Sequence, residues 1–322
     1  MRKIGIYVLS AAASCMLLSG CGAKVSPELM YQQGRLDEMV RSLPDDQVLA
    51  EPFAGDLCVV TGGEPQSDPF VNAEAAAVLS LSDQQVIFQK NVFERMHPAS
   101  ITKVMTALLA VRYGDLSEEI TVGDEAVITE AGSSLCNIRP GDRLTLKQLL
   151  YGLMLPSGND AGAAIAVHMA GSLEGFADMM NAEARRIGAT DTHFVNPHGL
   201  TEDTHLTTAY DLYLIMKEAL QYPVFREIIG TTTYPVSYTD GTGSAVTQTW
   251  QNSNRYLTGT VETPQGLHVL GGKTGTTNAA GYCLMIASED DLGQEYVSVV
   301  LKAGNRPDLY ENMTNIIRKI VK

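Results

Sequence analysis

HPASITKVMTALLA, residues 97–110, is the stretch around which the fold is organised. Apolar side chains recur at positions 101, 104, 105, 108, 109 and 111, which is the spacing of one helix face. The pattern predicts a helix from Ser100 to Tyr113 that Gly114 stops. Ser100 and Lys103 stand three residues apart, so they lie on the same face of that helix, one turn apart.

A serine one turn from a lysine is a pattern for nucleophilic catalysis. A serine hydroxyl is a weak nucleophile until a neighbouring group takes its proton, and a lysine can do so only when its pKa is lowered. Burial at the start of an apolar helix can lower that pKa, and the helix N-terminus adds partial positive charge where an oxyanion would form. The pattern also arises by chance with a solvated lysine, so it needs support elsewhere in the chain.

The rest of the chain supplies a helical block and two groups of strands. Helical spacing predicts helices at Leu146–Leu155, Asn159–Ala170, Leu173–Ile187 and Thr208–Leu220, the last opened by a capping box from Thr208 to Asp211. Strand patterns occur at Ala75–Leu81, Val86–Gln89, Thr231–Val236, Leu267–Thr274, Gly281–Ser288 and Tyr296–Lys302, and Pro307 can occupy the first turn of a closing helix that runs to about Val321. The prediction is an α+β fold: early strands (a hairpin) and late strands form one antiparallel sheet flanked by helices, with a central helical block.

Two further short motifs carry polar groups. Ser157-Gly158-Asn159 follows Pro156 in a turn between two helices, where a hydroxyl and a carboxamide can relay a proton and hold an amide, or merely cap the next helix. Lys273-Thr274-Gly275 lies at the end of a predicted strand, and glycines there let a ligand backbone approach. A nucleotide-binding P-loop is excluded, because Leu267 stands where its first glycine must be and no strand–loop–helix follows.

The three motifs, in this order, resemble those of the active-site serine penicillin-binding proteins and β-lactamases. The surrounding strings narrow the resemblance to low-molecular-mass D-Ala-D-Ala carboxypeptidases. Those strings are PASITKVMTALL (98–109), LLYGLMLPSGNDAG (149–162), FVNPHGL (194–200), TTAYDL (207–212) and GGKTGTTNAAGYC (271–283). The resemblance covers about residues 70–322 and implies a penicillin-binding/β-lactamase-like fold.

The resemblance also implies roles for individual residues. Ser100 would attack the carbonyl of the penultimate D-Ala, Lys103 would act as general base, Ser157 would pass a proton to the leaving nitrogen, and Asn159 would bind the substrate amide. The substrate-binding set would be Asn159, Lys273, Thr274, Gly275, Thr276 and Arg306, with the backbone N–H groups of Ser100 and Thr276 forming the oxyanion hole. The carboxylate-binding arginine is Arg306 or Arg255, and the sequence leaves that choice open.

The N-terminus reads as an export signal. Arg2 and Lys3 precede a short apolar stretch, and Leu18-Ser19-Gly20-Cys21 resembles a bacterial lipobox, in which the cysteine is acylated. We therefore expect a signal peptide at 1–20, a lipidated spacer at 21–68 and one catalytic domain at 69–322 on the outer face of the cell membrane. Many relatives continue into a further β-rich domain and a membrane-binding helix, and a lipid on Cys21 would replace that anchor.

Composition sets limits on partners. The formal net charge is −14, which opposes nucleic-acid binding. Neither the cysteines nor the histidines are spaced as metal ligands, and we assign no metal or organic cofactor. The expected partners are a peptidoglycan stem peptide ending in D-Ala-D-Ala and β-lactams as covalent inhibitors. The rival functions are a DD-endopeptidase, a class A-like β-lactamase and a non-catalytic β-lactam- or wall-binding module. Class A β-lactamases differ in carrying Asp at the position of Gly158 and a catalytic Glu on a later loop, whereas no Glu lies between Glu183 and Glu202 here.

Overall fold

The computed structural model describes residues 57–60 and 68–321, and the structural statements that follow concern those residues. The predicted signal peptide, Cys21 and all but a few residues of the predicted spacer lie outside them. Within the described part, no helix combines the length and the apolar character that crossing a bilayer requires.

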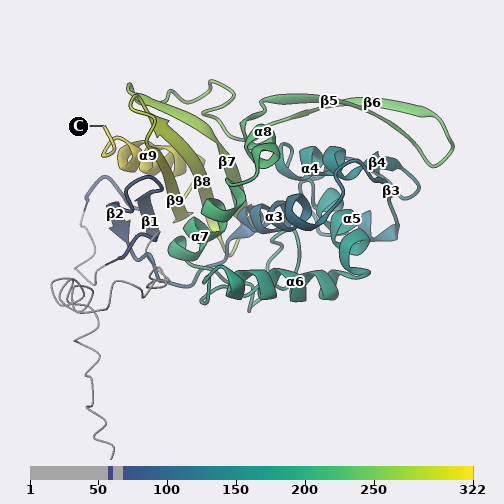
Figure 1. Ribbon diagram of the computed structural model, residues 1–322, viewed down its shortest axis with the longest axis horizontal. Coiled ribbons are helices and arrows are strands. Elements are labelled where there is room, and N and C mark those ends of the chain that lie inside the picture. Colours follow the sequence, from purple (N-terminus) through teal and green to yellow (C-terminus); the bar gives the residue numbers. More distant parts are fainter. Residues whose placement is uncertain (1–56, 61–67, 322) are drawn as a thin grey trace, which may run out of the picture. The chain divides into compact units, whose positions relative to one another are not determined.

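A five-stranded antiparallel sheet brings the early and late strands together (Figure 1). From one edge to the other its strands are β2 (Val86–Lys90), β1 (Ala75–Ser80), β9 (Glu295–Ala303), β8 (Gly281–Asp290) and β7 (Leu267–Thr277). β1 and β2 form the predicted hairpin, and β1 also pairs with β9, with Ala77 opposite Val299. The predicted α+β class and its sheet of early and late strands are confirmed, and β7 is an edge strand.

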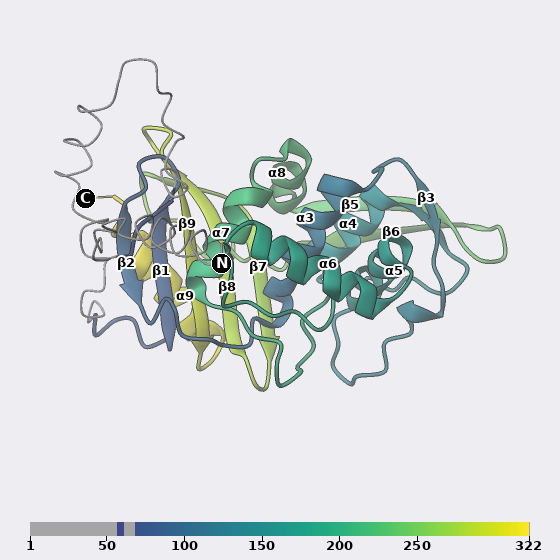
Figure 2. The same cartoon turned by 60° about the horizontal axis from the view of Figure 1, so that its bottom comes forward.

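Both faces of this sheet are buried. Along β1, Ala75, Ala77 and Leu79 enter one hydrophobic core, and Ala76 and Val78 enter another. Successive strand residues point to opposite faces, so a continuous apolar run belongs to a strand covered on both sides. α9 (Arg306–Ile317) covers one face, and α7 (Ala209–Ala219) packs against β1 and β9 on the other (Figure 2).

The central helical block is built around α3 (Lys103–Tyr113), which a 3₁₀ turn at Ala99–Thr102 precedes. α3 is buried from Lys103 to Ala110 and packs against each of the other helices of the block. Those helices are α4 (Leu146–Met154), α5 (Asn159–Ala170), α6 (Leu173–Arg186), α7 and α8 (Pro223–Gly230). The helices predicted from periodicity are confirmed, whereas the short α8 was not predicted.

A second antiparallel sheet was not predicted. Its strands lie in the order β3 (Glu119–Thr121), β4 (Arg143–Thr145), β5 (Thr233–Thr239) and β6 (Ala245–Gln251). The strand expected at 231–236 corresponds to β5, so it belongs to this second sheet and not to the sheet of early and late strands. β5 and β6 form a hairpin that Figure 1 shows extending over the helical block.

One predicted capping box and one predicted helix end need correction. Thr208 caps α7 by accepting a bond from Asp211 N, as expected, but Asp211 does not return it. Its carboxylate instead accepts from Asp191 N at 2.9 Å and Thr192 Oγ1 at 2.7 Å, so the capping box is incomplete. Pro307 lies in the first turn of the closing helix, as predicted, but that helix ends at Ile317 and not near Val321.

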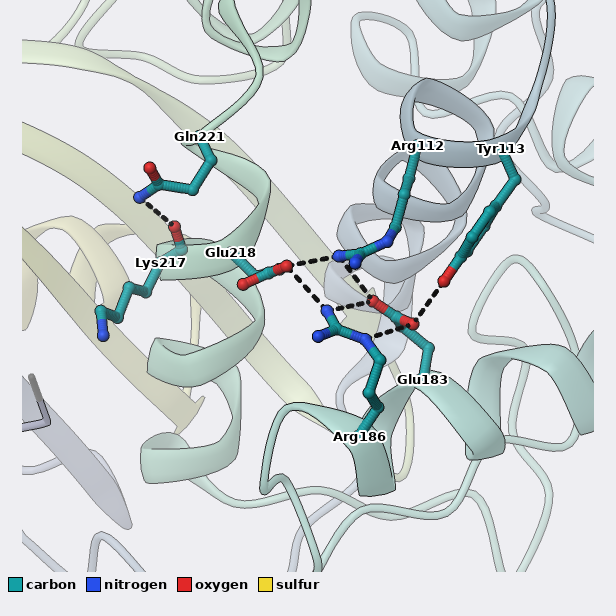
Figure 3. A network of polar contacts seen from close by, with 7 residues as sticks. All are labelled: Arg112, Tyr113, Glu183, Arg186, Lys217, Glu218 and Gln221. Carbon is teal, nitrogen blue, oxygen red and sulfur yellow. Dashed lines mark hydrogen bonds and ion pairs between the residues drawn. The ribbon is translucent and has the colours of Figure 1, made fainter. Parts of the chain in front are cut away.

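A charged network ties the far end of α3 to α6 and α7 (Figure 3). Glu183, only 3% exposed, accepts bonds from Arg186 at 2.8 Å and Tyr113 at 3.1 Å and lies 3.4 Å from Arg112. Both arginines also pair with Glu218. α3 is therefore anchored by ion pairs at the end that lies away from Ser100.

Candidate active site

Ser100 is held in the 3₁₀ turn before α3 by a strained backbone. Ala99 has φ +48°, a conformation that costs L-residues about 1–2 kcal/mol. The loop 196–199 packs directly against this turn: a Cβ on Gly199 would lie 1.9 Å from Ala99 O, and Gly199 itself has φ +87°. Because only glycine allows this contact, the loop fixes the position of Ser100 from outside its own helix.

Lys103 lies at the centre of a closed set of contacts. Its side chain is 0% exposed, and Nζ lies 2.9 Å from Ser100 Oγ, 2.7 Å from Asn159 Oδ1 and 2.7 Å from His198 O. The two oxygens of Asn159 and His198 only accept, so they occupy two N–H groups of the amine. When the amine is neutral, its lone pair is left facing the one partner that can donate, the Ser100 hydroxyl. This is the geometry of a general base.

The surroundings favour that neutral amine. Burial, followed by the positive charge of Lys273, holds the pKa of Lys103 well below its usual value, although Asp160 partly opposes this. Burial alone lowers the pKa of Lys273 to about 7. The predicted desolvation of Lys103 is thus present, and a second lysine adds to its effect.

The Ser157-Gly158-Asn159 turn faces the same point. Ser157 has φ +67°, and its buried Oγ has no hydrogen-bond partner within the described part of the chain. Gly158 is the N-cap of α5 without a side-chain bond, so neither Ser157 nor Asn159 serves as a cap. Backbone strain and an unsatisfied buried hydroxyl are both typical of residues at functional sites.

Strand β7 approaches Ser100 at Gly275. A Cβ there would lie 2.9 Å from Ser100 N and 3.0 Å from Pro98 O, so a glycine is needed for the close approach. Lys273 is 1% exposed and donates to Thr274 O at 3.0 Å. Thr274 Oγ1 lies 2.7 Å from Ser253 Oγ, which orients its hydroxyl. β7 therefore lies directly against the turn that carries Ser100.

Two cavities meet at Ser100. The smaller, about 150 Å³, is lined by residues 100, 134, 156, 157, 253, 274–276, 282, 306, 309 and 310. The larger, about 620 Å³, is lined by residues 100, 130–134, 159, 198–201 and 276–279. Ser100, Ser134 and Thr276 belong to both. Arg306 lies in the smaller cavity, whereas Arg255 does not line it and lies over the Tyr310 ring at 5.7 Å.

Three contributors were not predicted from the sequence. The carbonyl of His198 accepts from Lys103, Ser134 O accepts from Asn159 N at 2.9 Å, and Ser253 orients Thr274. The string FVNPHGL was a signal for the first, although a backbone carbonyl has no residue identity that sequence could reveal.

The histidines near the site are neutral. Burial and nearby positive charge lower the pKa of His198 and of His205 to about 3. His205 Nδ1 accepts from Val195 N, so its Nε2–H donates to Thr102 Oγ1. No group of potential metal ligands occurs among the described residues.

A comparison with known protein families identifies the family of this chain. The profile of the D-alanyl-D-alanine carboxypeptidase family matches residues 63–305. The chain belongs to that family. The motifs at Ser100–Lys103, Ser157–Asn159 and Lys273–Gly275 all lie within the matched residues.

Individual relatives agree with this assignment. The chain is 32% identical to the D-alanyl-D-alanine carboxypeptidase DacF of Bacillus subtilis, over 82% of this chain and 66% of that protein. It is 34% identical to the D-alanyl-D-alanine carboxypeptidase DacC of Escherichia coli, over 73% of this chain and 58% of that protein. The chain thus spans somewhat less than two thirds of the length of these curated relatives.

Solved structures confirm the fold. The crystal structure of the Streptomyces K15 DD-transpeptidase matches with a TM-score of 0.73 and 28% identity, over 79% of this chain and 98% of that one. The D-alanyl-D-alanine carboxypeptidase DacD of Francisella tularensis matches with a TM-score of 0.70 at 23% identity, over 85% of this chain and 76% of that one, a likeness of fold alone. The carboxypeptidase family thus shares the predicted α+β architecture.

Proposed function

We propose that this protein is a serine-type D-Ala-D-Ala carboxypeptidase that removes the terminal D-Ala from peptidoglycan stem peptides. The observation that carries the proposal is the buried Lys103 amine, whose other two contacts are pure acceptors and whose third is Ser100 Oγ. Ser100 attacks the carbonyl carbon of the penultimate D-Ala, and its proton passes to Lys103. The leaving D-Ala nitrogen takes a proton through Ser157, and water then hydrolyses the acyl-enzyme ester.

The smaller cavity suits the terminal D-Ala and its carboxylate. Thr274 and Arg306 line this cavity and supply a hydroxyl and a positive charge, and the buried amine of Lys273, which donates to Thr274 O, adds a second positive charge behind the lining. The N–H groups of Ser100 and Thr276 bind the oxyanion, because Gly275 lets the strand lie against the nucleophile. Asn159 holds the peptide amide.

The edge position of β7 supports a peptide as the substrate. An extended peptide can add to an exposed strand edge through main-chain hydrogen bonds. With its carboxylate near Thr274, such a peptide runs antiparallel to β7, and its acyl part passes Thr276 into the larger cavity. The scissile bond then lies beside Ser100, where the two cavities meet.

A β-lactamase is the rival enzyme reading, and the site offers it little. Gly158 stands where class A β-lactamases carry Asp. The segment between Glu183 and Glu202 provides a backbone carbonyl to Lys103 and no Glu for a hydrolytic water. A non-catalytic wall-binding module would have no need for the Ser100–Lys103 pair. A DD-endopeptidase uses the same chemistry on a cross-linked peptide and remains the second candidate.

The proposal is tested by mixing the purified protein with a muropeptide that ends in D-Ala-D-Ala and measuring the free D-Ala that is released. Ser100→Ala should abolish both D-Ala release and labelling by a fluorescent penicillin. Lys103→Arg, which keeps the charge but cannot accept a proton usefully, should slow acylation about 10²-fold or more. Penicillin labelling that persists on another residue in Ser100→Ala would refute the nucleophile.

We also propose that Cys21 carries a lipid that holds the protein on the outer face of the bacterial membrane. The support is the LSGC string after an apolar stretch, since these residues lie outside the described part. Cys21→Ala should release the protein from membranes or leave it unprocessed. A variant that stays with membranes and is cut at the same site would contradict the lipid anchor.

A further inference from the structure

The larger cavity contains an acidic group that the proposed chemistry does not use. The loop 130–134 forms one wall of the cavity, and Glu130 is at its start. Among the residues that line this cavity, the only other ionisable side chain is His198, which burial keeps neutral by lowering its pKa to about 3. Glu130 therefore sets the charge of that cavity.

Glu130 also differs from three of the acids near it in sequence. Glu118 pairs with His168 at 3.2 Å, Glu119 with Arg143 at 3.6 Å, and Glu125 accepts from Gly123 N at 2.8 Å. The Glu130 side chain forms no hydrogen bond or ion pair within the part of the chain that the structure describes, and it is exposed. Its carboxylate is available to a ligand.

The two cavities are thus opposite in charge. Arg306 lines the smaller one and Glu130 the larger one, and both cavities include Ser100 and Thr276. A peptide that places its terminal carboxylate beside Arg306 places the residues before its scissile bond in the cavity of Glu130. An extended chain advances about 3.3 Å per residue. The first side chain beyond the penultimate D-Ala, counted away from the carboxylate, is therefore that of the residue that precedes D-Ala-D-Ala.

We propose that Glu130 binds the primary ammonium group on the side chain that precedes D-Ala-D-Ala, and so selects stem peptides with a free side-chain amine at that position. This inference rests on the proposed function. A side chain whose nitrogen has been acylated, as in a cross-link, carries no such charge and loses the contact. The site therefore favours stem peptides that are not yet cross-linked through that amine.

The size of the preference follows from the exposure of Glu130. An exposed ion pair favours the matched substrate by up to about five-fold, and salt screens it. We expect this preference in kcat/KM at low ionic strength and its loss at about 1 M salt, where the Debye length falls to about 3 Å. A purely structural role for Glu130 would not produce that salt dependence.

The test uses three tripeptides, Nα-acetyl-Lys-D-Ala-D-Ala with the side-chain nitrogen free, acetylated or succinylated. Wild type should prefer the free amine over the acetylated peptide and disfavour the succinylated, negatively charged one. Glu130→Gln should bring the three kcat/KM values together, and Glu130→Lys should reverse their order. Asp124→Asn and Glu202→Gln remove one negative charge nearby without changing a residue that lines the cavity, and should keep the wild-type order.

The outcomes separate this inference from the proposed function. Release of D-Ala from all three peptides at equal rates by wild type would overturn the role of Glu130 and leave the carboxypeptidase intact. An equal loss on all three peptides in Glu130→Gln would also overturn it, because Glu130 would then act on a step common to them. If wild type released D-Ala from none, the proposed function itself would fail.

Discussion

Two lysines are buried beside Ser100, and in the described part of the chain neither forms an ion pair with a carboxylate. They differ in their contacts. Lys103 has three hydrogen-bond partners, including Ser100 Oγ, whereas Lys273 donates only to Thr274 O. These contacts fit the proposed roles, in which Lys103 takes the proton of Ser100 and Lys273 is a cation that a ligand carboxylate would complete.

The activity should therefore fall on the alkaline side when Lys273 loses its charge. Its pKa of about 7 in the free protein predicts a fall in kcat/KM for D-Ala release as the pH rises through about 7. Lys273→Arg keeps its charge, so its kcat/KM should stay level to higher pH even if it is lower throughout. The measurement is the pH profile of D-Ala release for both proteins.

The same lysine has a consequence for stability. Its folded-state pKa lies below the ordinary 10.5, so between about pH 7 and 10.5 the unfolded chain binds more protons and the free energy of unfolding rises with pH. Lys273→Met should remove the part of this rise in the free energy of unfolding that Lys273 contributes.

The activity profile has its own contradicting outcome. If Lys273→Arg showed the same alkaline fall in kcat/KM as wild type, Lys273 would not be the group that titrates.

At the scale of elements, sequence periodicity predicted the parts with a strong apolar pattern. The helix from Ser100, the Ala-rich helix at Asn159–Ala170 and the buried strand at Gly281–Ser288 are all present. The second sheet has weak signals by comparison. β3 and β4 contain three residues each, and β6 reads AVTQTWQ, with only its tryptophan fully buried.

The site was predictable to the extent that it is local. The contact between Ser100 and Lys103 follows from their three-residue spacing on a helical turn. The contact of Lys103 with the carbonyl of His198 depends on how the loop 196–199 packs against Ala99, and its contact with Asn159 depends on how α5 packs against α3. Neither the strained φ of Ala99 nor that packing has a local sequence signature, so tertiary structure alone supplies them.

The ion-pair network in Figure 3 should make the helical block sensitive to acid. Burial raises the pKa of Glu183, but bonds from Arg186 and Tyr113 and the charges of both arginines outweigh it, so the net pKa is lowered. Glu183→Gln should reduce the free energy of unfolding by about 1–3 kcal/mol at pH 7, since it removes hydrogen bonds to a charged group. Chemical denaturation at several pH values measures this.

The sign of the pH effect is fixed by the lowered pKa. The stabilisation is complete above the ordinary value of 4.5 and is lost as the pH falls through the lower folded-state value, so wild type and Glu183→Gln should converge in acid. Glu174→Gln, an exposed change on the same helix, should stay within about 0.5 kcal/mol of wild type. A difference that persists unchanged at low pH would contradict the role of this carboxylate.

For the whole molecule, the two cavities predict different fates for two acyl-enzymes. A peptide loses D-Ala from the smaller cavity, which makes room for water, whereas an opened penicillin keeps its leaving fragment attached. The segment between Glu183 and Glu202 contains no Glu that could serve as a base for that water. We expect rapid release of D-Ala from peptide and a long-lived penicillin adduct on Ser100. Mass spectrometry of the intact protein over time measures how long the adduct lasts.

The β-lactamase reading makes the opposite prediction. An adduct that disappears within seconds, with steady turnover of penicillin and no D-Ala release from peptide, would favour it. Ser100→Ala provides the control in both cases, because it should form no adduct at all.

The three buried cysteines lie in three different parts of the molecule and form no disulfide with one another. The thiol of Cys58 donates to Ser80 O at the end of β1. The backbone N–H of Cys136, just after the cavity loop 130–134, donates to the carboxylate of Asp160. Cys283 is on β8, opposite Gly275 of β7. Burial raises the pKa of each thiol, so a thiol reagent can react only when its region opens. The rate at which each thiol is modified therefore reports local opening of the structure around it. A covalently bound penicillin should slow modification of Cys136 more than that of Cys58.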